Sequence, residues 1–267
     1  MDKRTFDKIR EIVYDKSGIS LSQGKEALVR ARIGKRMRAL NIRQHHEYLD
    51  RVLNDESGEE IVNLLDVIAT NVTSFFREAN HFDFLKGVFL QWLKTGQKRF
   101  RFWSAACSTG EEPYTLAMVL SEVASSYGNI DIKILATDIS TRALAVCLNG
   151  TYEEQKLKAV PKLLLHRYFE RSKEGDKAFF TVSGAIKNMI VFRRLNLSKP
   201  PFPMRGPLDA IFCRNVMIYF DNIVRRRLLD NLYNLLKPSG YLMVGHAESL
   251  TGMVSDFKSV KPAIYTK

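Results

Sequence analysis

The stretch FRFWSAACSTGEEPYTLAM, residues 100–118, decides the fold of this 267-residue chain. Its first residues, FRFW, predict a short buried strand. The triplet STG at 108–110 predicts a turn. The triplet EEP at 111–113 then begins a helix, because a proline in the first turn lacks only an N–H group that has no partner within the helix. A strand, a turn with glycine and a helix form the first half of a nucleotide-binding βαβ unit.

The charge at the start of this helix indicates the kind of ligand. In most such units the helix N-terminus faces a pyrophosphate. Here Glu111 and Glu112 stand in that place, so a dinucleotide fits badly, whereas a nucleoside with positive charge, such as S-adenosylmethionine, fits better. The alternative is that both carboxylates only complement the helix dipole. We favour that alternative for Glu112 and ligand contact for Glu111, which adjoins the turn glycine.

A second strand, DIKILATD at 131–138, ends on Asp138. An acidic residue at this place hydrogen-bonds ribose hydroxyls in nucleotide-binding folds. The alternative is that Asp138 caps a helix at 141–148, a role that Ser140 can fill equally well. Helices and strands alternate throughout residues 100–267. This pattern predicts a doubly wound α/β sheet whose ligand lies at the carboxyl ends of the strands.

The remaining segments differ from this pattern. Residues 1 to about 69 have apolar residues at helical spacing and predict an all-helical unit. Residues 151–170 look helical as well, with Pro161 at the start of a second short segment. From 174 to 195 the pattern is strand-like, and part of this segment predicts a small antiparallel insertion in an otherwise parallel sheet.

Composition restricts the class of protein. With 45% hydrophobic and 26% charged residues the chain is typical of a soluble globular protein. No apolar run approaches the ~20 residues of a membrane span, and the N-terminus lacks the apolar segment of a signal peptide, so we expect a cytoplasmic protein. The three cysteines have no CxxC spacing and the five histidines no HxH or HExxH spacing, so we expect no metal centre.

Positive charge is concentrated near the N-terminus. The chain carries a net charge of +12, and residues 1–43 contain 12 Lys and Arg against 5 Asp and Glu. Such a segment indicates an anionic partner surface, which charge alone does not identify as nucleic acid or acidic protein. Six cations lie between residues 25 and 38 of the basic helix. For this helix, partner docking and a simple solvated face stand as equal alternatives.

Five motifs, in order along the chain, closely resemble those of the chemotaxis receptor methyltransferases, the CheR family of S-adenosylmethionine-dependent protein-glutamate O-methyltransferases. They are NVTSFFRE, FWSAACSTGEEPYTLAM, ATDIS, FCRNVMIYFD and LKPSGYLMVGHAES. The resemblance implies a helical, receptor-docking domain at 1–69 and a Rossmann-like class I methyltransferase domain at 70–267, with a β-subdomain at about 174–195. It further implies a partner, the cytoplasmic domain of methyl-accepting chemotaxis receptors, bound by the basic helix around Arg30 and Arg38, with no nucleic acid and no membrane insertion.

The resemblance also implies the site residues and the reaction. Arg77 and Tyr219 would lie closest to methyl transfer, which yields a glutamate methyl ester and S-adenosylhomocysteine during chemotactic adaptation. Glu111 would contact the methionine part of the cofactor and Asp138 its ribose. The other implied cofactor contacts are Asn71, Thr73, Arg77, Asn196, Leu197, Arg214 and Asn215.

Three other functions are weighed against this one. Amino-methylating enzymes of nucleic acids carry Asp/Asn-Pro-Pro-Tyr/Phe directly after the fourth strand. Here the nearest match, SKPPF at 198–202, precedes that strand, which ends in CRNVMIYF. A non-catalytic regulator that binds the cofactor stays open, although Arg77 and Tyr219 disfavour it. An NAD oxidoreductase is disfavoured by the carboxylates at the helix N-terminus.

Overall fold

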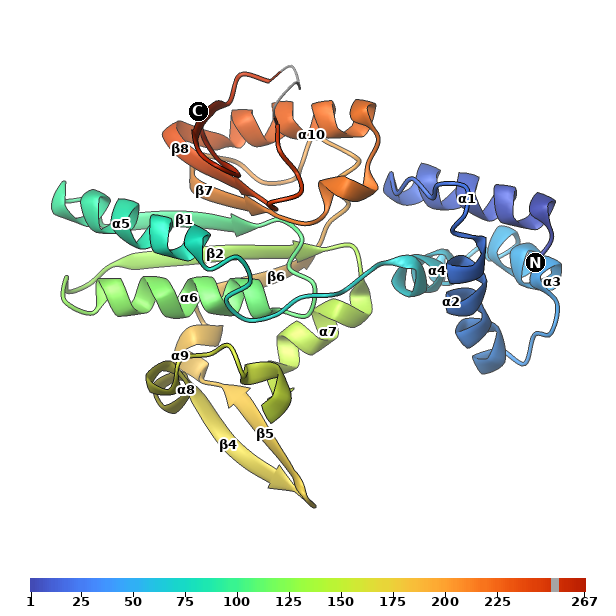
Figure 1. Cartoon of the computed structure of the whole chain (residues 1–267), viewed down its shortest axis with the longest axis horizontal. Helices are drawn as coiled ribbons and strands as arrows, with labels where there is room; N and C mark the ends of the chain where they lie inside the picture. Colours follow the sequence, from blue (N-terminus) through green and yellow to red (C-terminus); the bar gives the residue numbers. More distant parts are fainter. Residues whose placement is uncertain (251–254) are drawn as a thin grey trace.

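The structure is a computed structural model that describes residues 1–250 and 255–267. It consists of a helical N-terminal unit, a central sheet with helices on both faces, and a small antiparallel sheet that projects from one side (Figure 1). Within the described residues, no helix combines the length and apolar character needed to cross a bilayer. The sequence prediction of a parallel α/β sheet preceded by helices is confirmed.

Four helices form the N-terminal unit: α1 (Lys3–Ser17), α2 (Glu26–Ala39), α3 (His45–Leu53) and α4 (Glu59–Ile68). Gly18 ends α1 with φ of 72°, a left-handed conformation that glycine adopts without steric cost. The apolar residues at helical spacing meet in a separate core, which contains Phe6, Ile9 and Tyr48 among others. The helical unit thus has a hydrophobic core of its own, against which Ile139 from the segment after β2 also packs.

A buried carboxylate ties three of these helices together. Glu60, at the start of α4, accepts two hydrogen bonds from the Arg36 guanidinium of α2, at 2.9 and 2.6 Å. It accepts a third from the Tyr48 hydroxyl of α3 at 2.9 Å. A buried charge of this kind is stable only while its partners are present.

The central sheet has seven strands in the order β6-β2-β1-β7-β8-β10-β9. Their bounds are β1 (Arg99–Ser104), β2 (Asp131–Asp138), β6 (Ile190–Arg194), β7 (Leu208–Cys213), β8 (Leu236–Val244), β9 (Lys258–Lys261) and β10 (Ile264–Thr266). The strands from β6 to β8 run parallel, and β10 is antiparallel to β8. The strand order reverses between β1 and β7. Ligands of open α/β sheets bind at this kind of reversal, outside the carboxyl ends of the strands.

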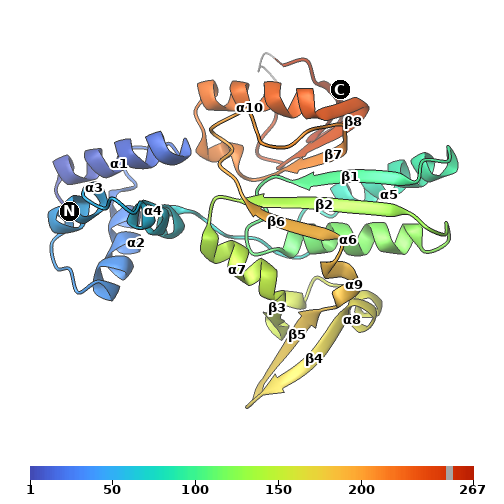
Figure 2. The same ribbon diagram turned by 180° about the vertical axis from the view of Figure 1, so that it is seen from behind.

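Helices cover both faces of this sheet (Figure 2). They are α5 (Asn80–Lys94), α6 (Glu111–Ala124), α7 (Thr141–Asn149) and α10 (Asn222–Leu235). Successive residues of β1 point to opposite faces. Phe102 therefore joins the core that includes α5 and α6, whereas Trp103 joins the core of α10.

The small sheet does not lie where the sequence pattern placed it. It pairs β3 (Thr151–Glu153) and β4 (Phe169–Glu174) with the middle strand β5 (Lys177–Val182). The antiparallel strands thus span 151–182. The sequence pattern places β6 in the insertion at about 174–195, whereas β6 is a parallel strand of the main sheet. The helix expected over 151–170 is interrupted as well. A three-residue strand is too short to show periodicity, and its partner lies far along the chain.

The segments between these strands are short helices: η1 (Glu154–Leu157), α8 (Lys162–Tyr168) and, before β6, α9 (Gly184–Lys187). Another 3-10 turn, η2 (Met217–Tyr219), follows β7. Pro161 stands directly before α8, so the sequence prediction that it begins a second helical segment is confirmed.

The role of Glu60 is testable by removing its charge. We expect Glu60→Gln to lower the free energy of unfolding by about 2 kcal/mol, because the Arg36 guanidinium loses a charged acceptor. Urea denaturation of the full chain measures this change. Glu59→Gln is the matched control, since Glu59 is exposed, and it should shift the value by less than about 0.5 kcal/mol. Equal losses in both variants would contradict the role given to Glu60.

Candidate functional site

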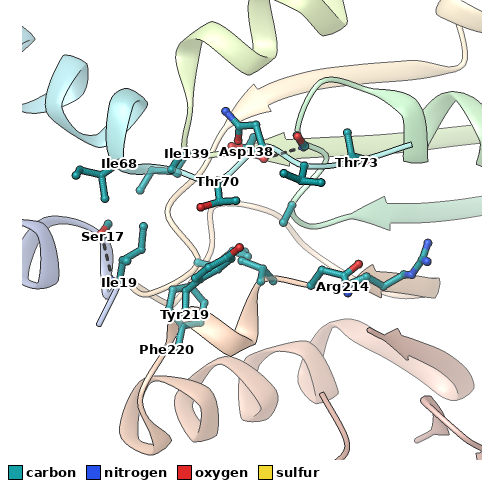
Figure 3. Close-up of a pocket in the computed structure, with 18 of the residues that line it drawn as sticks. Ser17, Ile19, Ile68, Thr70, Thr73, Asp138, Ile139, Arg214, Tyr219 and Phe220 are labelled. Atoms are coloured by element: carbon teal, nitrogen blue, oxygen red, sulfur yellow. Dashed lines mark hydrogen bonds between the residues drawn. The ribbon is translucent and has the colours of Figure 1, made fainter. Parts of the chain in front are cut away.

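A pocket lies at the carboxyl ends of β1, β2 and β7 and is closed on one side by the helical unit (Figure 3). Its empty space, including the open mouth, is about 1170 Å³. The helical unit contributes residues that include Ser17, Lys25, Arg32 and Ile68, and the linker between the two parts contributes residues 69–74 and Arg77. The pocket therefore needs both parts of the chain.

Asp138, the last residue of β2, lines this pocket. Its carboxylate accepts hydrogen bonds from the backbone N–H groups of Ser108 at 2.8 Å and Ser140 at 2.9 Å. Burial raises the pKa of this carboxyl. The helix that follows is capped by the Ser140 side chain, which accepts from the Ala143 N–H. The capping role is thus filled by Ser140, and this favours the interpretation of Asp138 as a ligand residue.

The turn after β1 has two features of a binding loop. Ser108 is a non-glycine residue with φ of 48°, a strained conformation that is frequent at functional sites. Ser108 lines the pocket, and its buried hydroxyl has no hydrogen-bond partner in the described structure. A Cβ atom on Gly110 would come within 2.8 Å of the Tyr152 hydroxyl, which explains the glycine.

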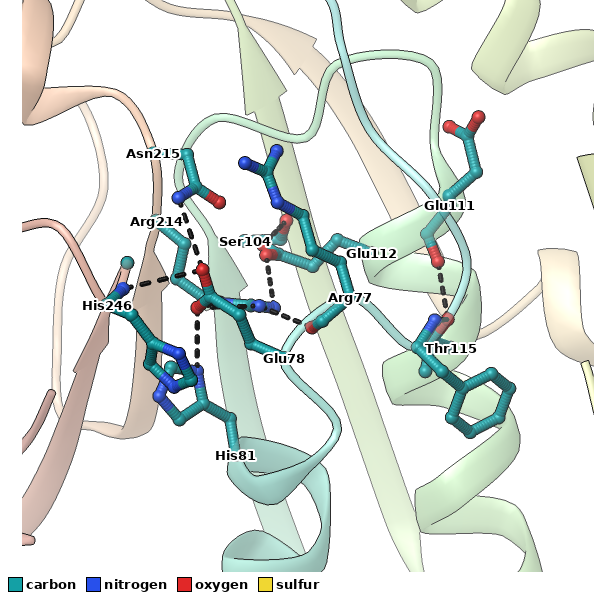
Figure 4. A network of polar contacts seen from close by, with 12 residues as sticks. Arg77, Glu78, His81, Ser104, Glu111, Glu112, Thr115, Arg214, Asn215 and His246 are labelled. Atoms are coloured by element: carbon teal, nitrogen blue, oxygen red, sulfur yellow. Dashed lines mark hydrogen bonds and ion pairs between the residues drawn. The ribbon is translucent and has the colours of Figure 1, made fainter. Parts of the chain in front are cut away.

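The two glutamates after this turn point in different directions (Figure 4). Glu111 is buried, accepts from the Thr109 hydroxyl at 2.6 Å, and lies 3.7 Å from Lys156. It is not among the residues that line the pocket. Glu112 does line the pocket and accepts from the Ser104 hydroxyl at 2.7 Å. The sequence favoured Glu111 for ligand contact, whereas the structure places Glu112 at the pocket wall.

Arg214, which directly follows β7, is the centre of a buried polar network (Figure 4). Its guanidinium donates to Glu112 at 3.0 Å, to Glu78 at 3.0 Å, and to the carbonyl of Arg77. Asn215 follows with φ of 57° and donates its side-chain amide to Glu78 at 3.3 Å. The network joins the interdomain linker to the ends of β1 and β7.

The pocket brings together nine of the ten residues that the sequence predicted for the site. They are Asn71, Thr73, Arg77, Asp138, Asn196, Leu197, Arg214, Asn215 and Tyr219, and the exception is Glu111. Their individual contacts with a ligand stay predictions.

Two hydrogen bonds join the helical unit to the sheet domain at the edge of the pocket. The Asn196 side chain donates to the carbonyl of Lys16 at 2.7 Å. The N–H of Ser20 donates to the carbonyl of Tyr219, also at 2.7 Å. The predicted site residues Asn196 and Tyr219 are thus positioned by the helical unit.

Sequence reasoning missed two glutamates of this site. Glu78 accepts from Arg214 and Asn215, and Glu248 accepts backbone N–H bonds from Asn215 at 2.6 Å, Gly245 at 2.8 Å and Ile218 at 3.1 Å. Glu78 is the last residue of the motif NVTSFFRE, and Glu248 lies near the end of the motif LKPSGYLMVGHAES. Their partners lie between 3 and 137 positions away, so local pattern gave no signal for the pairing.

A mainly parallel sheet with an antiparallel strand beside β8, and a pocket at the reversal of strand order, agree with the fold of a class I methyltransferase. A family model described as "CheR methyltransferase, SAM binding domain" matches residues 71–266, and one described as "CheR methyltransferase, all-alpha domain" matches residues 4–69. The chain therefore belongs to the CheR methyltransferase family, and its cofactor is S-adenosylmethionine.

Relatives that match nearly the full length of this chain carry names that agree with this family. A chemotaxis protein methyltransferase from Borreliella burgdorferi is 37% identical and covers 99% of this chain and 94% of its own length. Chemotaxis protein methyltransferase 2 from Pseudomonas aeruginosa is 36% identical, and the match covers 99% of this chain and 93% of that protein. The Escherichia coli chemotaxis protein methyltransferase is 34% identical, and the match covers 97% of this chain and 89% of that protein.

The residues at the pocket fit this cofactor. Asp138 offers an acceptor for ribose hydroxyls, and the backbone N–H of Ser108 holds its carboxylate in place. Ile139, Leu197 and Phe220 supply apolar surface for a base. A mainly apolar pocket with a few placed polar groups is the usual form of a cofactor site.

The role of Asp138 is testable by calorimetry. We expect Asp138→Asn to weaken binding of S-adenosylhomocysteine by about 10-fold to 100-fold, since a hydrogen bond to a charged acceptor is lost. Asp131→Asn, at the opposite, exposed end of the same strand, is the matched control and should bind as the unmodified chain does. Unchanged affinity in Asp138→Asn, with its thermal midpoint also unchanged, would contradict the assignment.

Proposed function

We propose that this protein transfers the methyl group of S-adenosylmethionine to glutamate side chains of chemotaxis receptors, giving glutamate methyl esters and S-adenosylhomocysteine. The observation that carries the proposal is the charge of the pocket lining. Lys25, Arg32 and Arg77 line it and form no ion pair with the described residues. Arg214 is balanced by Glu78 and Glu112, so Asp138 is the one carboxylate of the lining that remains without a cationic partner among the described residues. This excess of positive charge suits an anionic acceptor. The names of the relatives support a chemotactic role.

The chemistry asks for positioning rather than for proton transfer. A glutamate side chain has an unperturbed pKa near ~4.3 and is already ionised at neutral pH, so no general base is needed. When bound, S-adenosylmethionine supplies a methyl group activated by its sulfonium. The residues of this chain therefore bind and orient the acceptor and exclude water.

Arg77 is proposed to hold the acceptor carboxylate. One of its guanidinium nitrogens donates to the carbonyl of Val72 at 2.8 Å, which fixes the side chain at the pocket wall. Its remaining N–H groups are available for a carboxylate, with which guanidinium forms strong charge-assisted bonds. Tyr219 lines the same pocket, and its hydroxyl has no hydrogen bond to the described residues. We assign this hydroxyl a positioning contact near the transfer axis.

The basic helix α2 is proposed to dock the receptor. Some of its cations bond to other residues of this chain, and others are left for the receptor. Arg36 pairs with Glu60, and Arg32 donates to the carbonyl of Ile68 and to the hydroxyl of Thr70, so both have structural partners. Arg30, Lys35 and Arg38 are exposed and form no ion pair with the described residues. We therefore assign contact with the acidic receptor to these three.

The proposal is tested by incubating the full chain with methyl-labelled S-adenosylmethionine and the cytoplasmic fragment of a methyl-accepting receptor. We expect protein-bound label that mild base releases as methanol, as a carboxyl ester requires. Label that resists base, or label transferred to nucleic acid instead, would contradict the proposal.

Removal of the Arg77 side chain should separate turnover from stability. We expect Arg77→Ala to lower the rate of receptor methylation about 100-fold, because the acceptor carboxylate loses its orientation. The thermal midpoint should change little, since the side chain is only partly buried. Arg193→Ala, which removes an exposed arginine from β6, is the control for general charge loss. Near-normal turnover of Arg77→Ala would exclude this residue from the mechanism.

Charge reversal on α2 should act on receptor binding alone. We expect the double variant Arg30→Glu, Arg38→Glu to raise KM for the receptor fragment at least about 10-fold at low salt, with little change in the affinity for S-adenosylhomocysteine. Added salt should reduce the difference. A double variant Arg226→Glu, Arg227→Glu makes the same charge change on the exposed face of α10 and serves as the control. Equal KM values for the two double variants would contradict docking on α2.

A further inference from the structure

Three potential metal ligands meet beside the Arg214 network. Glu78 comes from the linker, His81 from α5, and His246 from the segment after β8 (Figure 4). One ligand atom of each lies within 4.8 Å of the others. The Nδ1 atom of His81 is 3.6 Å from a carboxylate oxygen of Glu78, and the two imidazole rings have centroids 5.1 Å apart.

No hydrogen bond within the described structure accounts for the burial of the polar His81 ring. Its exposed fraction is 0%, and neither ring nitrogen has a hydrogen-bond partner there. Buried polar groups are almost always satisfied, so each exception needs a reason. An imidazole nitrogen that makes no hydrogen bond has a lone pair available to ligate a metal ion.

We propose that Glu78, His81 and His246 form a binding site for a divalent transition-metal ion of the zinc type, with water as the fourth ligand. Two imidazoles and one carboxylate are a donor set that Zn²⁺ accepts, and an open fourth position is common where the ion is not fully enclosed by protein. The ion would give the buried His81 ring the partner that it lacks. It would also link the interdomain linker, α5 and the end of β8.

The spacing of the ligand atoms fits this proposal. Metal–ligand distances of about 2.0–2.2 Å place the atoms of a tetrahedral shell roughly 3.4 Å apart. The separation of 3.6 Å between His81 and Glu78 is already close to this value. His246 is exposed, so rotation of its side chain can shorten the longer separations without disturbing the core.

Neighbouring groups hold the carboxylate in place. Arg214 donates to Glu78 at 3.0 Å, and the N–H of His246 donates to its other oxygen at 3.4 Å. Partners of this kind orient metal ligands in known sites. Arg214 also competes for the same carboxylate charge, so we expect moderate rather than very tight affinity. Because the two histidines are 165 positions apart, sequence spacing indicated no metal centre.

The test uses the full chain, without an affinity tag and stripped of metal by EDTA. It is titrated with Zn²⁺ alone against a chromophoric chelator, and with Co²⁺ as a spectroscopic probe. We expect one equivalent of Zn²⁺ to bind, a rise in the thermal midpoint, and a Co²⁺ absorption band of tetrahedral type. Failure to bind Zn²⁺ at micromolar concentration would overturn the proposal.

The Zn²⁺ affinity of single-residue variants shows whether the ion binds at this cluster. His246→Ala removes an exposed ligand and should weaken Zn²⁺ binding at least about 10-fold. His246→Cys keeps a ligand at this place and should retain binding. His46→Ala is the matched control, because His46 is exposed and adjoins His45 in the helical unit. Unchanged affinity in His246→Ala, or loss of binding in His46→Ala, would place the ion elsewhere and overturn the proposal.

Discussion

The structure around the pocket depends on one buried cation. Arg214 is 5% exposed and lies between the carboxylates of Glu78 and Glu112, with the ring of Phe82 at 5.6 Å. Burial of these charges is costly unless each retains its partners, and loss of one partner leaves an uncompensated charge. The linker that carries Glu78, the start of α6 and the end of β7 are therefore held in a single arrangement. That arrangement forms one wall of the cofactor pocket.

The same constraint joins the two parts of the chain. Since the linker is held at the sheet, the helical unit that precedes it closes the pocket, and Lys16 and Ser20 bond to Asn196 and Tyr219. Asp66 of α4 also accepts from the Thr141 N–H at 2.8 Å, so the helical unit contacts the start of α7. A receptor segment docked on α2 would lie next to the cofactor pocket. This proximity gives a physical reason for a basic helix on a methyltransferase.

Much of this arrangement is predictable from sequence, and the failures have physical causes. The strand ending on Asp138 was predicted with its observed bounds, because a run of apolar residues between turn signals defines it. The insertion at 151–182 was misplaced because its pairing is non-local. For the two glutamates, the position next to Gly110 favours Glu111 for ligand contact, and this contact stays a prediction, although Glu112 rather than Glu111 lines the pocket. One residue along a helix rotates a side chain by about 100°, so only the three-dimensional phase of α6 shows which glutamate faces the pocket.

The most direct test of the central claim is a crystal structure of the chain with S-adenosylhomocysteine. The account predicts the ligand at the reversal between β1 and β7, with its ribose on Asp138 and with Arg214 still joining Glu78 to Glu112. A ligand bound elsewhere, or a pocket that takes up a dinucleotide diphosphate in its place, would contradict the account.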